Sequence, residues 1–147
     1  MNSESIPEYK IILASNSSIR QKILEDSGIS FEVVPSEVEE EELKQSLSGN
    51  NFREYCLTLA KAKALDVSNK KKNAYVIGSD QICCYGEEIF SKPLTKENCF
   101  KTLSKLSGNT HYQNCGISIC KNGKEIWSHY AQAALTMKSL SDREIRD

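Results

Sequence analysis

Residues Ala74-Tyr75-Val76-Ile77-Gly78-Ser79-Asp80-Gln81 are the most informative part of the chain. The first four are hydrophobic, as in a short buried strand, and Gly78 permits either a turn or the close approach of a ligand. We therefore predict that the strand ends at Gly78 and that Asp80 follows at its carboxyl end, where open α/β sheets tend to bind ligands. The alternative is that Asp80 caps a turn or a helix.

Strand and helix patterns alternate on both sides of this stretch and later give way to hairpins. The turn signals are Gly86-Glu87 and Asn122-Gly123. The predicted strands are 11–14, 31–34, 74–77, 82–85, 88–90, 111–120 and 125–137. The predicted helices are 18–26, 52–67 and 96–106, with Ser17, Asn51 and Thr95 as their N-terminal caps. This order predicts one α/β domain over residues 1–147, with a mixed central sheet flanked by helices.

Two acidic or polar segments cannot be assigned to a complete strand or helix. Residues 36–47 carry a run of glutamates and have no clear structure in the pattern. Ser141-Asp142-Arg143-Glu144 has the sequence of a capping box, but only a few residues follow it. The pattern indicates the start of a helix, but too few residues follow to complete it, so we expect the domain to be incomplete at its C-terminus.

Composition excludes several classes of protein. The chain has 147 residues, of which 39% are hydrophobic. Its net charge is −1, so it lacks the excess of positive charge that is typical of nucleic-acid-binding proteins. No hydrophobic run approaches the roughly 18 residues that span a membrane. Residues 1–10 do not resemble a signal peptide, so a cytoplasmic location is expected. The 6 cysteines match no zinc-site spacing and are interpreted as reduced packing residues.

A candidate anion site follows the first strand. Ser15 and Ser17 precede a helix N-terminus, where free backbone N–H groups and hydroxyls favour a phosphate. Arg20, in the first turn of that helix, can donate two hydrogen bonds to phosphate oxygens. The alternative is ordinary capping by Ser17 and a surface arginine.

Lys63 is a stronger candidate for a functional residue, because it shares one helix face with the apolar residues Phe52, Cys56 and Leu59. Such a lysine either extends to the surface or meets a buried anion. Lys92, just before a proline, would alone be taken for a surface residue. The acidic run 39–42 is ordinarily solvated, yet one member could join Asp80 at a divalent cation.

Six short motifs, in order, make the chain resemble the Maf-like nucleoside triphosphate pyrophosphatases. The resemblance runs from Ile11 to about Ile145. The matching motifs are residues 12–20 (Ile-Leu-Ala-Ser-Asn-Ser-Ser-Ile-Arg), 36–40 (Ser-Glu-Val-Glu-Glu), 59–64 (Leu-Ala-Lys-Ala-Lys-Ala), 77–81 (Ile-Gly-Ser-Asp-Gln), 92–94 (Lys-Pro-Leu) and 106–111 (Leu-Ser-Gly-Asn-Thr-His).

The resemblance implies a mixed sheet with a cleft, similar to inosine triphosphate pyrophosphatases, and hydrolysis of a nucleoside triphosphate to the monophosphate and pyrophosphate. It implies a divalent cation, Mg²⁺ or Mn²⁺, and allows a homodimer; no nucleic acid polymer or membrane is expected as a partner. By position, Asp80 resembles the residue that activates water, and Glu40 resembles its partner at the metal. The residues that resemble the triphosphate cradle are Ser15, Arg20, Lys63 and Lys92.

Two positions bear on the nucleobase. A branch of the family that acts on dTTP and UTP tends to have arginine where Ile19 stands and threonine where Gln81 stands. A branch that acts on 7-methyl-GTP has Ser-Asp-Gln, as here, so 7-methyl-GTP is the expected substrate. The usual tryptophan at position 19 is absent. The alternatives are the dTTP/UTP branch and a truncated, catalytically weak protein that binds nucleotides or a partner.

Overall fold

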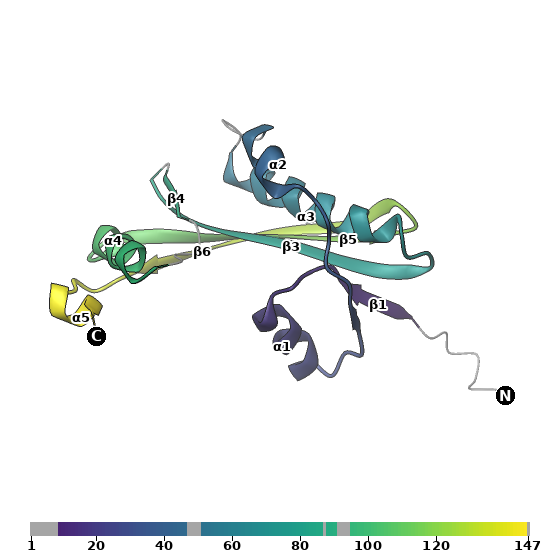
Figure 1. The fold of residues 1–147 in the computed structure, drawn as a ribbon, viewed down its shortest axis with the longest axis horizontal. Helices are drawn as coiled ribbons and strands as arrows, with labels where there is room; N and C mark the ends of the chain where they lie inside the picture. The colour runs from purple at the N-terminus through teal and green to yellow at the C-terminus, as the bar shows by residue number, and fades with distance from the viewer. Residues whose placement is uncertain (1–8, 47–50, 87, 91–94, 147) are drawn as a thin grey trace. The chain divides into compact units, whose positions relative to one another are not determined.

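The structure, a computed structural model, describes residues 9–46, 51–86, 88–90 and 95–146. Strands and helices alternate through its first half (Figure 1). The strands are β1 Lys10–Leu13, β2 Glu32–Val33, β3 Ala74–Tyr85, β4 Glu88–Phe90, β5 Thr110–Lys121 and β6 Lys124–Thr136. The helices are α1 Ser18–Asp26, α2 Glu40–Ser46, α3 Phe52–Ser68, α4 Lys96–Leu106 and α5 Asp142–Arg146. The predicted α/β class is confirmed.

Over the described residues the strands form one 6-stranded sheet in the order β2-β1-β3-β5-β6, and β4 pairs with β3. Strand β1 is parallel to both of its neighbours, with Ile12 opposite Val76 on β3. Strand β4 runs antiparallel to β3, with Cys84 opposite Ile89. The sheet is therefore mixed, as the sequence predicts, and the cleft implied by the resemblance stays a prediction.

The chain divides into two compact units, which we describe separately. The first comprises the described residues up to Asp80 together with Gly116–Tyr130, and the second comprises Gln81–Cys115 and the described residues from Ala131 onward. Strands β3, β5 and β6 each contribute residues to both units. The prediction of a single domain over the whole chain stays a prediction.

Helix α3 provides one side of the core of the first unit. Its Ala64 and Val67 pack with Ile12 of β1, Val76 of β3 and Cys120 of β5, all almost completely buried. The N-cap is Asn51, whose Oδ1 accepts the Glu54 N–H at 2.8 Å, as predicted. Figure 1 shows α1 on the opposite side of β1 and β3 from α3. The sheet segment of this unit is thus flanked by helices.

The predicted strand end at Gly78 is wrong. Strand β3 continues unbroken to Tyr85, so Asp80 lies in the middle of a strand. A Cβ atom at Gly78 would lie 2.4 Å from the Ala60 carbonyl oxygen of α3, and one at Gly116 would lie 2.6 Å from the Cys56 carbonyl carbon. The absent side chains therefore allow α3 to approach the sheet closely; Gly78 serves packing rather than a turn.

Two other features of the first unit depend on local chemistry. The undetermined segment 36–47 contains α2, whose first turn carries Glu40, Glu41 and Glu42. Carboxylates are favourable there because the N-terminal end of a helix is electropositive. The predicted hairpin between β5 and β6 turns through Asn122 and Gly123, with φ angles of 52° and 79°. Those two residue types adopt positive φ most readily.

The second unit contains the other predicted caps. Thr95 caps α4 by accepting the Asn98 N–H at 3.0 Å, and Gly108 follows this helix with φ 69°. At α5, Ser141 and Glu144 exchange two hydrogen bonds of 3.2 Å, so the capping box is confirmed. Local sequence patterns therefore predicted these helix ends correctly.

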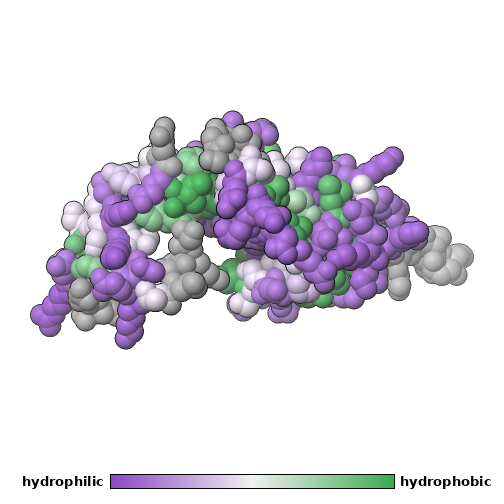
Figure 2. Space-filling model, turned by 45° about the horizontal axis from the view of Figure 1, so that its top comes forward, coloured by the Kyte–Doolittle hydropathy of each residue, from purple (hydrophilic) through white to green (hydrophobic). Residues whose placement is uncertain are grey.

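Polar side chains cover most of the face shown in Figure 2, and hydrophobic residues appear there as separate patches. Within the part of the chain that the structure describes, every helix is too short or too polar to span a membrane. The six cysteines, all among the described residues, form no disulfides, and Cys56, Cys84 and Cys120 are buried in the core.

Candidate functional site

The close contact between α3 and β3 places Lys63 opposite Asp80. Gly78 and Asp80 lie on the same face of β3, because side chains alternate along a strand. Ala60 and Ala64 cover Gly78 from α3, and Lys63 lies between these two alanines in the sequence of the same helix. The small residues at this crossing thus bring an ammonium group to a buried carboxylate.

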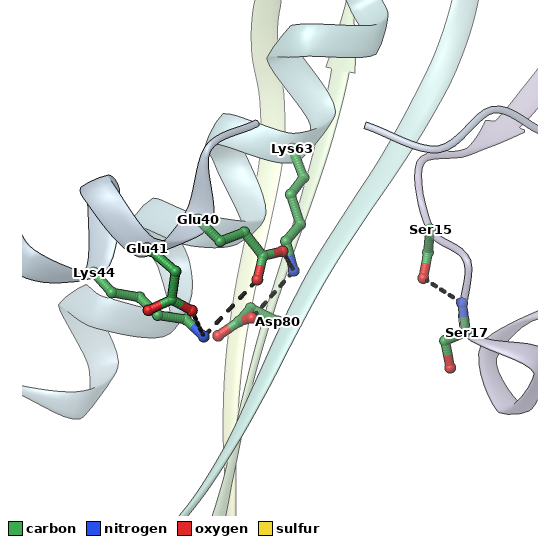
Figure 3. Close-up of polar contacts among 7 residues, drawn as sticks. All are labelled: Ser15, Ser17, Glu40, Glu41, Lys44, Lys63 and Asp80. Carbon is green, nitrogen blue, oxygen red and sulfur yellow. Dashed lines mark hydrogen bonds and ion pairs between the residues drawn. The ribbon is translucent and has the colours of Figure 1, made fainter. Parts of the chain in front are cut away.

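Lys63 joins two carboxylates from different elements (Figure 3). Its Nζ lies 2.8 Å from Glu40 Oε1, at the start of α2, and donates to Asp80 Oδ1 at 3.2 Å. The Lys63 side chain is 12% exposed and that of Asp80 11%. Of the two interpretations of Lys63, the one that places it against a buried anion is therefore correct.

Asp80 is set up to accept a proton. Burial raises the pKa of its carboxyl, and the nearby charge of Glu40 raises it further, although the charge and hydrogen bond of Lys63 act in the opposite direction. Its second oxygen, Oδ2, is buried and has no hydrogen-bond partner among the described residues. One oxygen is thus held by Lys63, and the other remains available for a ligand.

Glu40 has the opposite electrostatic balance. Burial alone would raise its pKa, but the hydrogen bond and charge of Lys63 outweigh burial and lower it, with smaller contributions from Lys44 and Arg20. Lys44 Nζ lies 3.9 Å from Glu40 Oε2, one helical turn away on α2. Glu40 therefore stays ionised where Asp80 is the better proton acceptor, a division of roles typical of paired catalytic carboxylates.

The loop between β1 and α1 carries the predicted anion-binding residues. Ser15, nearly buried, accepts the Ser17 N–H with its Oγ at 3.0 Å, and Ser17 in turn accepts the Arg20 N–H at 3.3 Å. Figure 3 shows the two serines apart from the Lys63 cluster. The charge of Arg20 lowers the pKa of both Glu40 and Asp80. Arg20 is therefore close enough to the two carboxylates to influence their ionisation.

The remaining predicted site residues are Ile19, Gln81 and Lys92. Ile19 is 73% exposed on α1. Gln81 belongs to the second unit, where its Nε2 donates to Gln113 Oε1 at 3.0 Å. Lys92 lies outside the described residues. The roles predicted for these three residues stay predictions.

Sequence reasoning missed two residues beside the site. Lys44 is one turn beyond Glu40, a spacing at which opposite charges on a helix meet, so this pair could have been found. Tyr55 is buried on α3, and its pKa is raised by burial and then by the charge of Asp80. Tyr55, Leu59 and Lys63 recur at helical spacing, which was the available signal for Tyr55.

The predicted metal ligands can be tested against the donors present. No group of three or more histidine, cysteine, aspartate or glutamate side chains gathers into a metal site within the described residues. Asp80 and Glu40 instead supply two carboxylates, with Asp80 Oδ2 unpaired. That donor set fits Mg²⁺, which is commonly bound by one or two carboxylates while substrate phosphates complete its coordination.

Replacing Lys63 by methionine should raise the pKa of the Asp80 carboxyl further, because the ammonium group lowers that pKa by both its charge and its hydrogen bond. The measurement is a carbon-13 NMR titration of the Asp80 carboxyl carbon in the metal-free chain. Lys61→Met, on the exposed side of α3, is the control and should leave the titration unchanged. An Asp80 pKa that stayed constant or fell in Lys63→Met would contradict this account.

Comparison with known proteins extends these observations. The family model described as "Maf-like protein" matches residues 10–147. A nucleoside triphosphate pyrophosphatase of Legionella pneumophila is 39% identical over 143 residues, which cover 97% of this chain and 72% of that protein. A 7-methyl-GTP pyrophosphatase of Mesorhizobium japonicum is 40% identical over 133 residues, or 89% of this chain and 67% of that protein.

Among solved structures, a HAM1 protein from Coxiella burnetii superimposes with a TM-score of 0.52 over 86% of this chain and 71% of its own. The two sequences are only 13% identical, so the likeness concerns the fold alone. It agrees with the mixed sheet flanked by helices.

Proposed function

Because this chain belongs to the family of Maf-like proteins, we propose that it hydrolyses a nucleoside triphosphate to the monophosphate and pyrophosphate. Relatives at 38–40% identity carry the names nucleoside triphosphate pyrophosphatase and 7-methyl-GTP pyrophosphatase. The observation that carries the proposal is the buried Lys63, which touches both Asp80 and Glu40.

Asp80 is the proposed base. It would take a proton from a water molecule as the water oxygen bonds to the α-phosphorus, and the bond from that phosphorus to the bridging oxygen would break. Pyrophosphate leaves with the electron pair of the broken bond. Burial supports this role, because it raises the proton affinity of Asp80 above that of an exposed carboxylate.

Cationic and donor groups would neutralise the triphosphate. Lys63 lies next to Asp80, and Arg20 is near enough to shift the pKa of both carboxylates. Ser15 and the N-terminus of α1 offer hydroxyl and backbone N–H donors, which suit phosphate oxygens. Lys92 is assigned to the same group by family resemblance. Such groups stabilise the negative charge that builds on the departing pyrophosphate.

Asp80 and Glu40 are the residues that would hold a divalent cation, Mg²⁺ or Mn²⁺. The unpaired Asp80 Oδ2 and the lowered pKa of Glu40, which keeps it ionised, support this assignment. When bound, the cation would neutralise phosphate oxygens and favour ionisation of water near neutral pH. Lys63 would then turn from the carboxylates toward the phosphates, since its flexible side chain can reorient.

The proposed nucleobase of the substrate is 7-methylguanine. Two features support it: the sequence Ser79-Asp80-Gln81, and isoleucine rather than arginine at position 19. The alternative within the family is dTTP or UTP. The same proposal includes a cytoplasmic location and, by family resemblance, allows a homodimer.

The test is hydrolysis of 7-methyl-GTP, UTP, dTTP, CTP and inosine triphosphate with Mg²⁺ in water labelled with oxygen-18. We expect pyrophosphate from one or two of these nucleotides, with the label in the monophosphate, because attack occurs at the α-phosphorus. A chelator should abolish the release. Label in pyrophosphate, or single phosphate from every nucleotide, would contradict the reaction. Binding without turnover by the folded chain would favour a nucleotide-binding protein.

A further inference from the structure

The segment that leads into α2 lies along one stripe of α3. Lys63 and Asp66 lie about one turn apart on α3, and Lys70 follows shortly after the end of that helix. Lys63 contacts Glu40, while Asp66 and Lys70 both contact Glu37. The stripe therefore holds the residues just before Glu40 as well as Glu40 itself.

The contacts along this stripe differ in strength. Asp66 Oδ2 accepts the backbone N–H of Glu37 at 2.8 Å, and the Asp66 side chain is only 24% exposed. Lys70 reaches the Glu37 carboxylate at 3.0 Å, but those side chains are 49% and 81% exposed. Exposed ion pairs contribute little because water screens them, whereas a carboxylate bound to a backbone N–H forms a strong hydrogen bond. Asp66 is thus the main anchor of this segment.

Asp66 also differs from Lys63 in being independent of the reaction. Lys63 bridges Asp80 and Glu40 in this structure. If those two carboxylates bind a cation, the ammonium can no longer hold both. The hydrogen bond from the Glu37 N–H to Asp66 involves neither Asp80 nor Glu40, so it persists when Lys63 moves away from those two residues.

We propose that Asp66 is a positioning residue that keeps Glu40 at the cation site by holding the Glu37 N–H. The inference rests on the proposed function, because it assumes that Glu40 helps to bind the cation. It predicts that loss of the Asp66 acceptor weakens cation binding even though Asp66 does not itself touch the cation. Supporting residues of this kind typically contribute 10- to 100-fold in metal affinity.

The experiment measures the dissociation constant of Mn²⁺ by electron paramagnetic resonance, without nucleotide, for wild type and three variants. Asp66→Ala removes the acceptor and should weaken Mn²⁺ binding by about 10- to 100-fold. In Asp66→Asn the amide oxygen still accepts the N–H, so affinity should stay within about threefold of wild type. Lys70→Met, which removes the ion pairs of Lys70 with Glu37 and with Asp66 but keeps the Asp66 acceptor, should also stay within about threefold.

A second measurement guards against a variant that fails to fold. Hydrogen exchange of the Glu37 amide should be slow in wild type and Asp66→Asn and fast in Asp66→Ala. If Asp66→Ala does not fold, Glu37→Pro removes the same N–H with Asp66 intact and should weaken Mn²⁺ binding equally.

Three outcomes would overturn the inference: wild-type affinity in Asp66→Ala, an equal loss in Lys70→Met, or an equal loss in Asp66→Asn. A wild-type chain that binds no Mn²⁺ at millimolar concentration would overturn it as well. The proposed function is decided separately by pyrophosphate release. If wild type releases pyrophosphate and Asp66→Ala binds Mn²⁺ with wild-type affinity, the inference is refuted and the proposed function is not.

Discussion

The Asp80→Asn variant should release pyrophosphate about 10²- to 10⁴-fold more slowly than wild type, the range expected when a general base is removed. Asparagine has nearly the same shape, and its Oδ1 can still accept the hydrogen bond that Lys63 donates at 3.2 Å. It cannot take the proton from water or offer a charged oxygen to a cation. The measurement is the rate of pyrophosphate release at saturating nucleotide and Mg²⁺.

Stability separates loss of chemistry from loss of fold. The pKa of Asp80 is raised in the folded chain, mainly by burial. A raised pKa contributes stability that is fully present below the pKa of the unfolded chain and is lost as pH rises through the folded pKa. At neutral pH, Asp80→Asn should therefore be at least as stable as metal-free wild type, measured by urea unfolding.

A matched control for this variant is Asp26→Asn on α1. Asp26 lies 3.9 Å from Lys22 in a pair whose side chains are 76% and 67% exposed, so its loss should alter neither rate nor stability. Full metal-dependent activity in Asp80→Asn would refute the assignment of the base. Reduced activity accompanied by lower stability would instead indicate a structural role.

Gly78→Ala should be the most damaging change to the fold. Its Cβ would lie 2.4 Å from the Ala60 carbonyl oxygen and 2.8 Å from the Ala64 amide nitrogen, both backbone atoms that cannot rotate away. Helix α3 would have to shift, and overpacking of this kind costs about 1–3 kcal/mol. We expect the melting temperature to fall by roughly 3–10 °C in a chain of this size.

The same shift should reduce activity, because α3 carries Lys63. A displacement of about 1 Å at a reacting group can cost on the order of 10²-fold in rate. Gly28→Ala is the control: an added Cβ meets nothing within 4 Å, although φ is +76°. The strain of that φ alone costs about 1–2 kcal/mol, so Gly28→Ala should lose comparable stability but, because α3 is not displaced, keep its activity. A Gly78→Ala chain with wild-type melting and activity would contradict the close packing of α3 on β3.

The elements that the sequence predicted well are those with local causes. Ser17, Asn51 and Thr95 cap their helices through hydrogen bonds to backbone N–H groups within the next turn. Asn122 and Gly123 turn the β5–β6 hairpin because both tolerate positive φ. Each of these features needs only a few neighbouring residues, so a short pattern is enough to predict it.

Gly78 shows where such patterns fail. A glycine after an apolar run is equally consistent with a turn and with a close crossing of another element. Only the position of Ala60 on α3 distinguishes the two, and Ala60 is far from Gly78 in sequence. For the same reason, a pattern that predicted α3 itself could not predict that Asp80 lies in mid-strand beneath that helix.

The sequence by itself determined the α/β class, most strands and helices, the caps and turns, and the residue types of the site, because periodicity and hydrogen bonding within a turn act over short distances. It did not determine α2 or the full length of β3. Only the tertiary structure decided that Lys63 meets both Glu40 and Asp80, that the pKa values of these two carboxylates move in opposite directions, and that Asp66 holds the segment before Glu40. Those facts depend on burial and on distances between residues far apart in the chain, which are set when α3 packs on the sheet.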